Sequence, residues 1–469
     1  MDKHEEIART KTACIETARL KTAQLTYILH AVVVALLLIQ DGLAQSPGVP
    51  SLPTTTADYV GYAVDNLPSY FQPGSDVGDV NNTPIDNPIT NAGATLGRAL
   101  FYDGRLSHND STSCASCHKQ ENGFSDPDQL SVGFEGGLTG RHSMGLSNAA
   151  FYENGRFFWD ERAATLEDQV LMPIQDSVEM GTDLNQLREE LSATEFYPVL
   201  FNEAYGSTEI TNDKIANSLA QFVRSMASYQ SKFDDARAAG PVGSPAYRAE
   251  LTQLERQGSN IFHGAGRCST CHESDAQIAD RPHNIGLDAD NSADEGVVDG
   301  RFKVPSLRNV AVREGYMHDG RFMTLGEVID FYSTDIQDNP NLDVGLQVDG
   351  DNPIRFNFTQ NEKDALIAFL ETLTDDALLG TELFSDPFVE LAGDFDGSGL
   401  VDAADLEYWQ DSAGSGFYFL EWQRNLGRSW EDLAAGSIIT NAIPEPSVAV
   451  LTATALLCSI GVCRRRFQT

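Results

Sequence analysis

The chain has 469 residues, which is enough for about three domains at roughly 150 residues each. Hydrophobic residues make up 41% of it, a share sufficient for folded cores. The formal net charge of −37 argues against a nucleic-acid partner. It indicates a heavily hydrated surface that would also steer a basic redox partner.

The N-terminal region has the features of an export signal. The apolar run "ILHAVVVALLLI" at 29–40 is too short to span a membrane comfortably, and "DGLAQS" follows it with small residues. These features predict a signal peptide over 1–44 with cleavage after Ala44. The long segment before the run mixes acids and bases, so the natural start could lie downstream of Met1. We expect an exported protein of the periplasm or the cell surface.

Two cysteine motifs carry the chemistry. "SCASCH" puts Cys114 and Cys117 on a two-residue spacer directly before His118. C-x-x-C-H is the attachment signature of c-type haem, in which the thiols bind the vinyl groups and the histidine binds iron. The arrangement recurs in "RCSTCH", which comprises Cys268, Cys271 and His272. The alternatives are a thioredoxin-like pair or half of a zinc site. A zinc site needs a second ligand pair close by, whereas each motif has its own histidine. Two covalently bound haem c groups are therefore predicted.

The other cysteines fit an exported protein. Of the seven, the three outside the motifs lie in the terminal segments: Cys14, Cys458 and Cys463. The body of the chain then has no spare thiol that could mispair in an oxidising compartment.

The pattern between and after the motifs is helical. Two sets of apolar residues follow the 3.6-residue period of a half-buried helix, and no convincing run of alternating strands is present. The sets are Ile215, Leu219, Phe222, Val223 and Met226, and Leu366, Phe369, Leu370 and Leu373. The stretch 236–250, "ARAAGPVGSPAYRAE", is typical of a linker. We predict an all-α fold with two cytochrome c-type haem domains, 45–235 and 248–385.

A separate calcium module is predicted at 390–436. "DFDGSGLVDAAD" at 394–405 places oxygen ligands at loop positions that calcium prefers, with glycine at the sixth. The ligands would be Asp394, Asp396, Ser398, Leu400 through its carbonyl, Asp402 and Asp405. The unit resembles one half of an EF-hand-like dockerin repeat, and "LEYWQ" recurs as "LEWQ". An Asp-rich solvent loop is the alternative. Such modules bind a partner or act as spacers, so this one would tether the protein.

The C-terminal tail resembles a PEP-CTERM sorting signal. Residues 443–469 join Pro-Glu-Pro, a short apolar stretch and the arginines 464–466, which would stay cytoplasmic. The resemblance implies that a sorting protease removes the tail after transport. The alternative is an ordinary membrane anchor, so the anchor is either transient or retained.

Residues from about 90 to 375 resemble the bacterial dihaem cytochrome c peroxidases and the related MauG proteins. The resemblance rests on "LGRALFYDGRLS", both haem motifs, "FFWDERAATLEDQVLMPIQDSVEM", "KVPSLRNVAVREGYMHDGRF" and "TLGEVIDFY", which occur in the family's order. It implies a peroxidatic N-terminal haem domain and an electron-transfer C-terminal one. Dimers are common in the family, which leaves a homodimer open.

The resemblance assigns three catalytic positions. Trp159 matches a tryptophan that relays electrons or holes between the haems, although a packed aromatic is the commoner fate of tryptophan. Glu179 and Gln169 match the distal-pocket pair. A carboxylate with a raised pKa can move a proton between the two oxygens of peroxide, and such help is worth about 10²–10⁴-fold. Without the resemblance, Glu179 would read as an exposed charge.

The axial ligands depart from the peroxidase pattern. Phe134 stands where most of these peroxidases have a second histidine, so the first haem should be five-coordinate. His142 is the nearest rival ligand, but by alignment it replaces an asparagine that helps bind calcium between the domains. That replacement and "REG" at 313–315 put the interdomain calcium in doubt.

At the second haem, Tyr332 stands where the peroxidases have an axial methionine. Thr324 and Glu327 form a capping box that starts a helix, and Leu325, Val328, Ile329 and Tyr332 share its inner face. MauG-like proteins use a tyrosine here as iron ligand, and a phenolate stabilises ferric iron. A buried core tyrosine is the alternative, with Met317 as the fallback ligand.

We therefore predict an oxidoreductase that reduces hydrogen peroxide at the N-terminal haem. Electrons would pass through Trp159 from the C-terminal haem and a donor such as cytochrome c. The alternatives are MauG-like oxidation of a side chain in a protein substrate, and a surface electron carrier without turnover.

Overall fold

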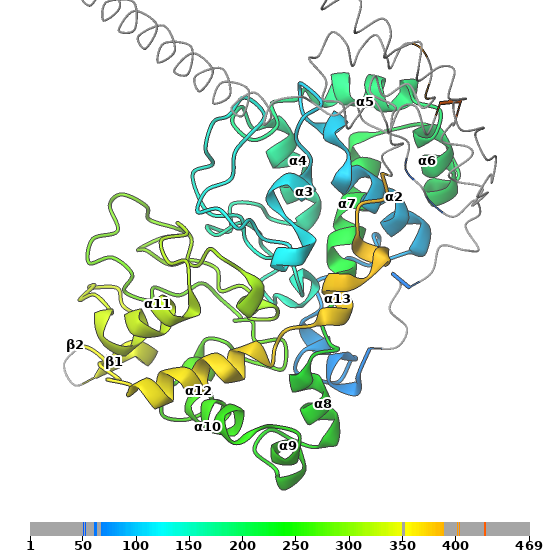
Figure 1. Ribbon diagram of the computed structural model, residues 1–469. Helices are drawn as coiled ribbons and strands as arrows, with labels where there is room; N and C mark the ends of the chain where they lie inside the picture. The colour runs from blue at the N-terminus through cyan, green and yellow to red at the C-terminus, as the bar shows by residue number, and fades with distance from the viewer. Residues whose placement is uncertain are drawn as a thin grey trace, which may run out of the picture.

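The computed structural model describes residues 67–348 and 352–388, together with positions 50, 52, 61, 62, 401, 403, 426 and 427. This part of the chain is mainly helical, as expected (Figure 1). The predicted signal peptide, the calcium ligands and the sorting tail lie outside it. None of the helices in the described part is long and apolar enough to cross a membrane.

The helices follow one another through long irregular connections (Figure 1). The longer ones are α2 (Asn91–Tyr102), α4 (Leu166–Gln175), α5 (Leu184–Ala193), α6 (Tyr197–Tyr205), α7 (Asn212–Ser225), α10 (Gln253–Phe262) and α12 (Gln360–Glu371). The shorter ones are α3 (Cys114–Cys117), α8 (Lys232–Ala239), α9 (Pro245–Ala249), α11 (Leu325–Asp330) and α13 (Asp376–Gly380). The only named sheet of the described residues pairs β1 (Gln347–Val348) antiparallel with β2 (Asn352–Pro353), with Val348 opposite Asn352.

The first core forms where α2 packs against α7. Thr211 caps the start of α7 by accepting a hydrogen bond from the backbone of Lys214. The four predicted positions from Ile215 to Val223 are buried and Met226 is the C-cap, so the predicted helix is confirmed. A Cβ atom at Gly97 would lie 2.0 Å from the carbonyl oxygen of Ser218, so only glycine allows this close approach of the two helices.

The second core repeats this arrangement with α10 and α12. Leu366, Phe369 and Leu370 lie on the buried face of α12, and Leu373 lies buried just beyond its end. The predicted face is therefore confirmed. A Cβ atom at Gly258 of α10 would lie 1.9 Å from the carbonyl oxygen of Ala365, which makes glycine necessary here as well.

The prediction of a linker over 236–250 is wrong. Helices α8 and α9 occupy most of this stretch, and Ala236 and Tyr247 are buried in the second core. Gly240 ends α8, and Ser244 caps α9 with Pro245 at its first position. The glycines and prolines thus mark helix ends inside the second core rather than a free connection.

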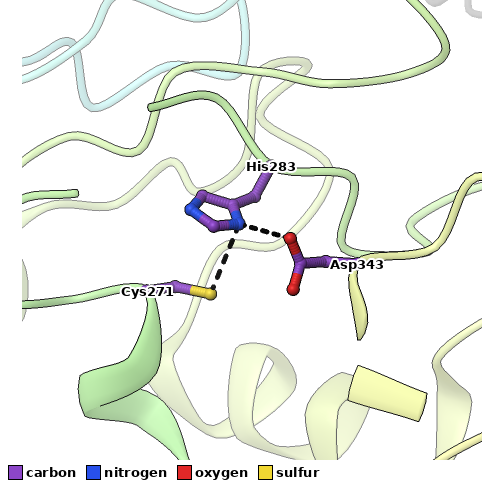
Figure 2. A group of neighbouring side chains, drawn as sticks. All are labelled: Cys271, His283 and Asp343. Atoms are coloured by element: carbon purple, nitrogen blue, oxygen red, sulfur yellow. Dashed lines mark hydrogen bonds and ion pairs between the residues drawn. The ribbon is translucent and has the colours of Figure 1, made fainter. Parts of the chain in front are cut away.

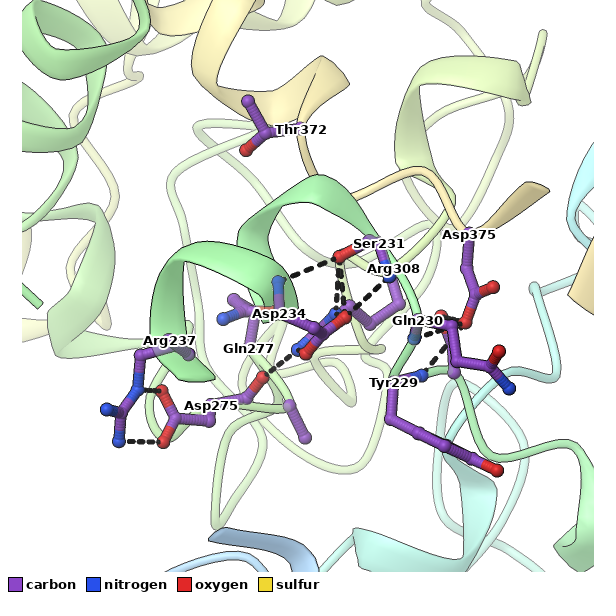
Figure 3. Close-up of polar contacts among 12 residues, drawn as sticks. Tyr229, Gln230, Ser231, Asp234, Arg237, Asp275, Gln277, Arg308, Thr372 and Asp375 are labelled. Atoms are coloured by element: carbon purple, nitrogen blue, oxygen red, sulfur yellow. Dashed lines mark hydrogen bonds and ion pairs between the residues drawn. The ribbon is translucent and has the colours of Figure 1, made fainter. Parts of the chain in front are cut away.

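A buried polar network fixes the entry to the second core (Figure 3). The guanidinium of Arg308, fully buried, donates to the carboxylate of Asp234 (2.8 Å) and to the carbonyl oxygen of Asp275 (2.5 Å). Asp375 accepts hydrogen bonds from the backbone amides of Tyr229 (2.9 Å) and Gln230 (3.0 Å). The segment that leads from α7 to α8 is therefore fixed by the Asp375 carboxylate at its start and by the Asp234–Arg308 pair at its end.

Candidate haem sites

The first motif forms a single helical turn, α3. Ser113 and Ser116 form a capping box at its start, and His118 follows its last residue. The Nδ1 atom of His118 lies 3.0 Å from the carbonyl oxygen of Phe124, so it donates there and Nε2 is left as the free ligand atom. Burial lowers the pKa of His118, which keeps the ring neutral as iron ligation requires. Cys114 and Cys117 are both free thiols.

Glu179 lies close to this motif. Burial, with a smaller contribution from Asp176, raises the pKa of the Glu179 carboxyl. Its charge in turn acts on the thiols of Cys114 and Cys117, which places the three groups in one neighbourhood. Gln169 is half-buried on α4, the helix that ends shortly before Glu179. The structure thus brings Glu179 to the first motif, while the catalytic roles of both residues stay predictions.

Phe134 lies beside the same segment. Its backbone amide donates to the carbonyl oxygen of Glu179 (3.1 Å), and its ring lies 6.1 Å from the ring of His108. A Cβ atom at Gly181 would be only 2.5 Å from the Phe134 ring, which therefore covers that glycine closely. The residue beside Glu179 is therefore a phenylalanine, whose side chain has no atom that could bind iron.

Both ring nitrogens of His142 have partners. Nε2 lies 3.2 Å from the hydroxyl of Ser125, and Nδ1 lies 3.2 and 3.1 Å from the carbonyl oxygens of Asp128 and Gln129. The ring is buried, and burial lowers its pKa. Because moving this ring to an iron would break those contacts, the geometry disfavours His142 as a ligand.

Trp159 is hydrogen-bonded to residues from two distant parts of the chain, His142 and Lys303. Its indole Nε1 donates to the carbonyl oxygen of His142 (2.8 Å), and its own carbonyl accepts from the backbone amide of Lys303 (2.8 Å). The backbone amide of His142 donates to the carbonyl oxygen of His318 (2.9 Å). The imidazole of His318 stacks on Phe302 at 3.6 Å, and both border the cavity of the second motif.

The second motif opens into a cavity of about 210 Å³. Cys268, Cys271 and His272 border it, and Trp159 lies on another part of its wall. Burial lowers the pKa of His272 to about 4, so its ring is neutral. Cys268 and Cys271 are free thiols whose pKa values burial raises.

Tyr332 and Met317 both border this cavity. The predicted capping box is present, since Thr324 accepts from the backbone of Glu327 and the Glu327 carboxylate accepts from Thr324. α11 then passes into a π-helical turn, Phe331–Asp335, which carries Tyr332. Burial and the two motif thiols raise the pKa of the Tyr332 phenol. The choice between Tyr332 and Met317 as ligand stays a prediction.

Comparison with known proteins identifies the family. The profile of the di-haem cytochrome c peroxidase family matches residues 91–240. The methylamine utilization protein MauG of Methylophilus methylotrophus is 31% identical over 304 residues, covering 63% of this chain and 86% of that protein. The chain belongs to the di-haem cytochrome c peroxidase and MauG family.

Other relatives carry both kinds of name. The cytochrome c551 peroxidase of Nitrosomonas europaea is 29% identical over 302 residues, covering 60% of this chain and 80% of that protein. A solved MauG-like protein associated with microbial copper homeostasis is 32% identical, with a TM-score of 0.59 over 69% of this chain and 99% of its own. The diheme peroxidase BthA of Burkholderia thailandensis, 23% identical with a TM-score of 0.52 over 64% of this chain and 91% of its own, shares the fold.

Membership in this di-haem family implies two haem c groups, and the residues fit them. Each motif offers two free thiols and a neutral imidazole, which are the groups that thioether formation and iron ligation need. The second motif also borders a cavity of about 210 Å³. Cys114, Cys117 and His118 would hold the first haem, and the matching residues of the second motif the other.

The structure adds two residues that the sequence did not single out (Figure 2). Next to Cys271, the Nδ1 atom of His283 lies 2.7 Å from the carboxylate of Asp343 and 3.7 Å from the Cys271 sulfur. These three are the one group of metal-ligand type within the described residues. A thioether at Cys271 would remove its thiolate, so we read the group as a support for the haem edge. No local spacing links residues so far apart in sequence.

The region in which an interdomain calcium was in doubt contains a buried arginine side chain. Arg313 is buried, and its guanidinium donates to the carbonyl oxygens of Ser306 (3.2 Å) and Arg308 (2.7 Å). A Cβ atom at Gly315 would lie 2.2 Å from the His142 ring, so that ring fills the space beside it. A divalent cation next to a guanidinium would be repelled. The interdomain calcium thus stays in doubt, as the sequence indicates.

Proposed function

We propose that the chain is a peroxidase that reduces hydrogen peroxide to water at its N-terminal haem. The observation that carries the proposal is the Glu179 carboxyl, whose pKa is raised beside Cys114 and Cys117. The family membership supports an oxidoreductase acting on peroxide. Glu179 is the proposed acid and base, Gln169 its polar orienting partner and Trp159 the electron relay.

The haem supplies, when bound, the iron that takes up the oxidising equivalents of peroxide. Glu179 accepts a proton from one peroxide oxygen and delivers it to the other, which then leaves as water. A carboxyl with a raised pKa suits both steps, because a pKa nearer the working pH lets the group accept a proton and then release it. Phe134 offers no group that could close the iron site.

Electrons would then reach the first haem from the second through Trp159. Support for this comes from the Trp159 indole, which donates to the carbonyl oxygen of His142 and borders the cavity of the second motif. A small redox protein such as cytochrome c is the proposed donor. A non-catalytic electron carrier is the rival, and it would show no fast haem spectral change when peroxide is added to the oxidised protein.

Replacing Glu179 tests this proposal. In Glu179→Gln we expect the rate of peroxide reaction to fall by about 10²–10⁴-fold, because the amide cannot accept the proton. In the unaltered protein the rate should fall as the pH drops through the raised pKa of Glu179, since only the carboxylate accepts a proton. That acid limb should vanish in the variant.

Stopped-flow absorbance of the haem after mixing with peroxide measures both effects. Glu135→Gln is the matched control, since Glu135 is exposed on the neighbouring loop. A Glu179→Gln protein with an unchanged rate and an unchanged acid limb would contradict the role of Glu179.

A second candidate is MauG-like oxidation of a side chain in a protein substrate. Tyr332 at the wall of the second cavity favours it, because a phenolate ligand stabilises the higher oxidation states in which two oxidising equivalents are stored. Electron paramagnetic resonance of the ferric protein tests the iron ligands on which this candidate rests. One high-spin and one low-spin haem without a methionine ligand supports this candidate, and two low-spin haems contradict it.

We further propose that the chain is exported and that its two haem units divide near Ser231, before α8, rather than at the predicted 235–248, because α8 and α9 belong to the second core. Support comes from the apolar run at 29–40 and from the sorting-signal resemblance of 443–469, with a sorting protease as partner. The segment 390–436 would bind calcium and tether the enzyme at the periplasmic or cell surface. A homodimer remains an open alternative.

A further inference from the structure

Tyr152 and Glu161 form a buried pair that flanks Trp159 in the sequence, and the peroxide reaction described above does not use them. The hydroxyl of Tyr152 donates to the carboxylate of Glu161. The side chain of Tyr152 has no exposed surface, and Glu161 is only 4% exposed. If these two side chains only filled the core, an apolar pair would serve as well. The hydrogen bond of a buried polar pair adds little stability once the cost of desolvating both groups is subtracted.

One residue joins this pair to Trp159. The backbone amide of Lys303 donates to the Trp159 carbonyl oxygen (2.8 Å), while its side-chain nitrogen lies 4.0 Å from the centre of the Tyr152 ring. The same nitrogen donates to the carbonyl oxygen of Arg156 (3.1 Å). Lys303 therefore contacts both the phenol ring of Tyr152 and the backbone of Trp159, the proposed electron relay.

The carboxylates that meet two other tyrosines each have a guanidinium partner. Tyr197 donates to Asp103, and Tyr70 donates to Asp234. Asp103 is paired with Arg105 (2.9 Å), and Asp234 is paired with Arg308 (2.5 Å). The bonded guanidinium stabilises the charged form of each carboxylate, although burial outweighs it at Asp103 and raises the pKa of that group.

No such cation is bonded to the carboxylate of Glu161 in the part of the chain that the structure describes. Its oxygens accept instead from the amide of Asn154, at 2.9 and 2.8 Å. Asn154 is exposed, so the carboxylate lies one residue from solvent. A proton that Glu161 receives from Tyr152 is therefore only a short distance from solvent.

We propose that Tyr152 is an oxidation site that gives an electron to Trp159 and its hydroxyl proton to Glu161. The inference rests on the proposed peroxide reaction, in which peroxide is the oxidant that leaves Trp159 one electron short. The O–H bond of Tyr152 breaks as the electron moves to the oxidised indole. The indole is restored, Glu161 becomes neutral, and a neutral tyrosyl radical remains. A later electron from the external donor restores the phenol, and Glu161 returns the proton.

Rapid freezing after mixing with peroxide tests this in the full chain with both haems attached. Electron paramagnetic resonance should detect a tyrosyl radical, identified by the narrowing that deuterated tyrosine produces. In Tyr152→Phe the ring packing is kept and the signal should disappear. In Glu161→Gln the hydrogen bond can persist without a proton acceptor, so the signal should fall and a tryptophan signal should last longer.

Tyr197→Phe is the matched control, because Tyr197 is equally buried and also bonded to a carboxylate. It should keep the signal. A signal that survives Tyr152→Phe, or that Tyr197→Phe removes, overturns the proposal. The haem absorbance is followed in the same mixing experiment. Haems that react without any tyrosyl radical overturn this inference alone, whereas haems that do not react overturn the proposed function with it.

Discussion

The pKa values of single residues in this protein depend on the balance between burial and nearby charge. Glu179 and Lys303 show it with opposite signs, since burial raises the pKa of the carboxyl and lowers the pKa of the ammonium. At Lys303 two aromatic rings, those of Tyr152 and Phe157, face the nitrogen and favour its charged form. Burial outweighs them and lowers the pKa of Lys303 to about 7.

The stability of the protein should therefore depend on pH through Lys303. The folded lysine loses its proton near pH 7, whereas an unfolded lysine keeps it to about pH 10. The unfolded state binds more protons in that window, so the free energy of unfolding contributed by this group rises with pH. Relative to Lys303→Met, the natural protein should gain about 1.4 kcal/mol for each pH unit in mid-window. Denaturant unfolding of both proteins measures the difference, and parallel pH profiles would contradict it.

At the scale of elements, each core is built on one close helix crossing that a glycine permits. Gly97 serves the crossing of α2 and α7, and Gly258 that of α10 and α12. The helix periods of both partners can be read from the sequence. The need for glycine cannot, because it arises from a carbonyl oxygen far away in the chain. The π-helical turn that carries Tyr332 is likewise set by packing around the cavity.

A methyl group at Gly258 should therefore separate α10 from α12. We expect Gly258→Ala to lower the free energy of unfolding by about 1–3 kcal/mol, because the Cβ atom would overlap the Ala365 carbonyl oxygen. Gly326→Ala is the control, since the nearest atom there, in Thr324, is 3.7 Å away. It should change stability by less than about 1 kcal/mol. Equal effects of the two substitutions in thermal or denaturant unfolding would refute this account of the crossing.

At the scale of the whole molecule, the acidic surface determines which donors approach quickly. The net charge of −37 attracts a basic redox protein over distances that salt shortens. The Debye length falls from about 30 Å at 0.01 M to about 8 Å at 0.15 M ionic strength.

Reduction of the oxidised protein by a basic cytochrome should therefore slow by about 10-fold or more over this range. An acidic cytochrome of similar potential should instead react faster as salt is added. Stopped-flow rates at several salt concentrations measure both. A basic donor whose rate ignores salt would show that the charge does not steer the encounter.

The two haem motifs, the helical class and the family could all be predicted from local sequence. A haem motif is local, since two thiols and a histidine within five residues need no other part of the chain to be recognised. The faces of α7 and α12 and the capping box at Thr324 were equally readable, because helix periods and caps act over one or two turns. Only the tertiary structure decided that 236–250 belongs to the second core and that His142 has both nitrogens engaged. It alone brought Glu179 to the first motif, and His283 and Asp343 to Cys271. These outcomes depend on contacts between residues distant in sequence, whose distances no local pattern records.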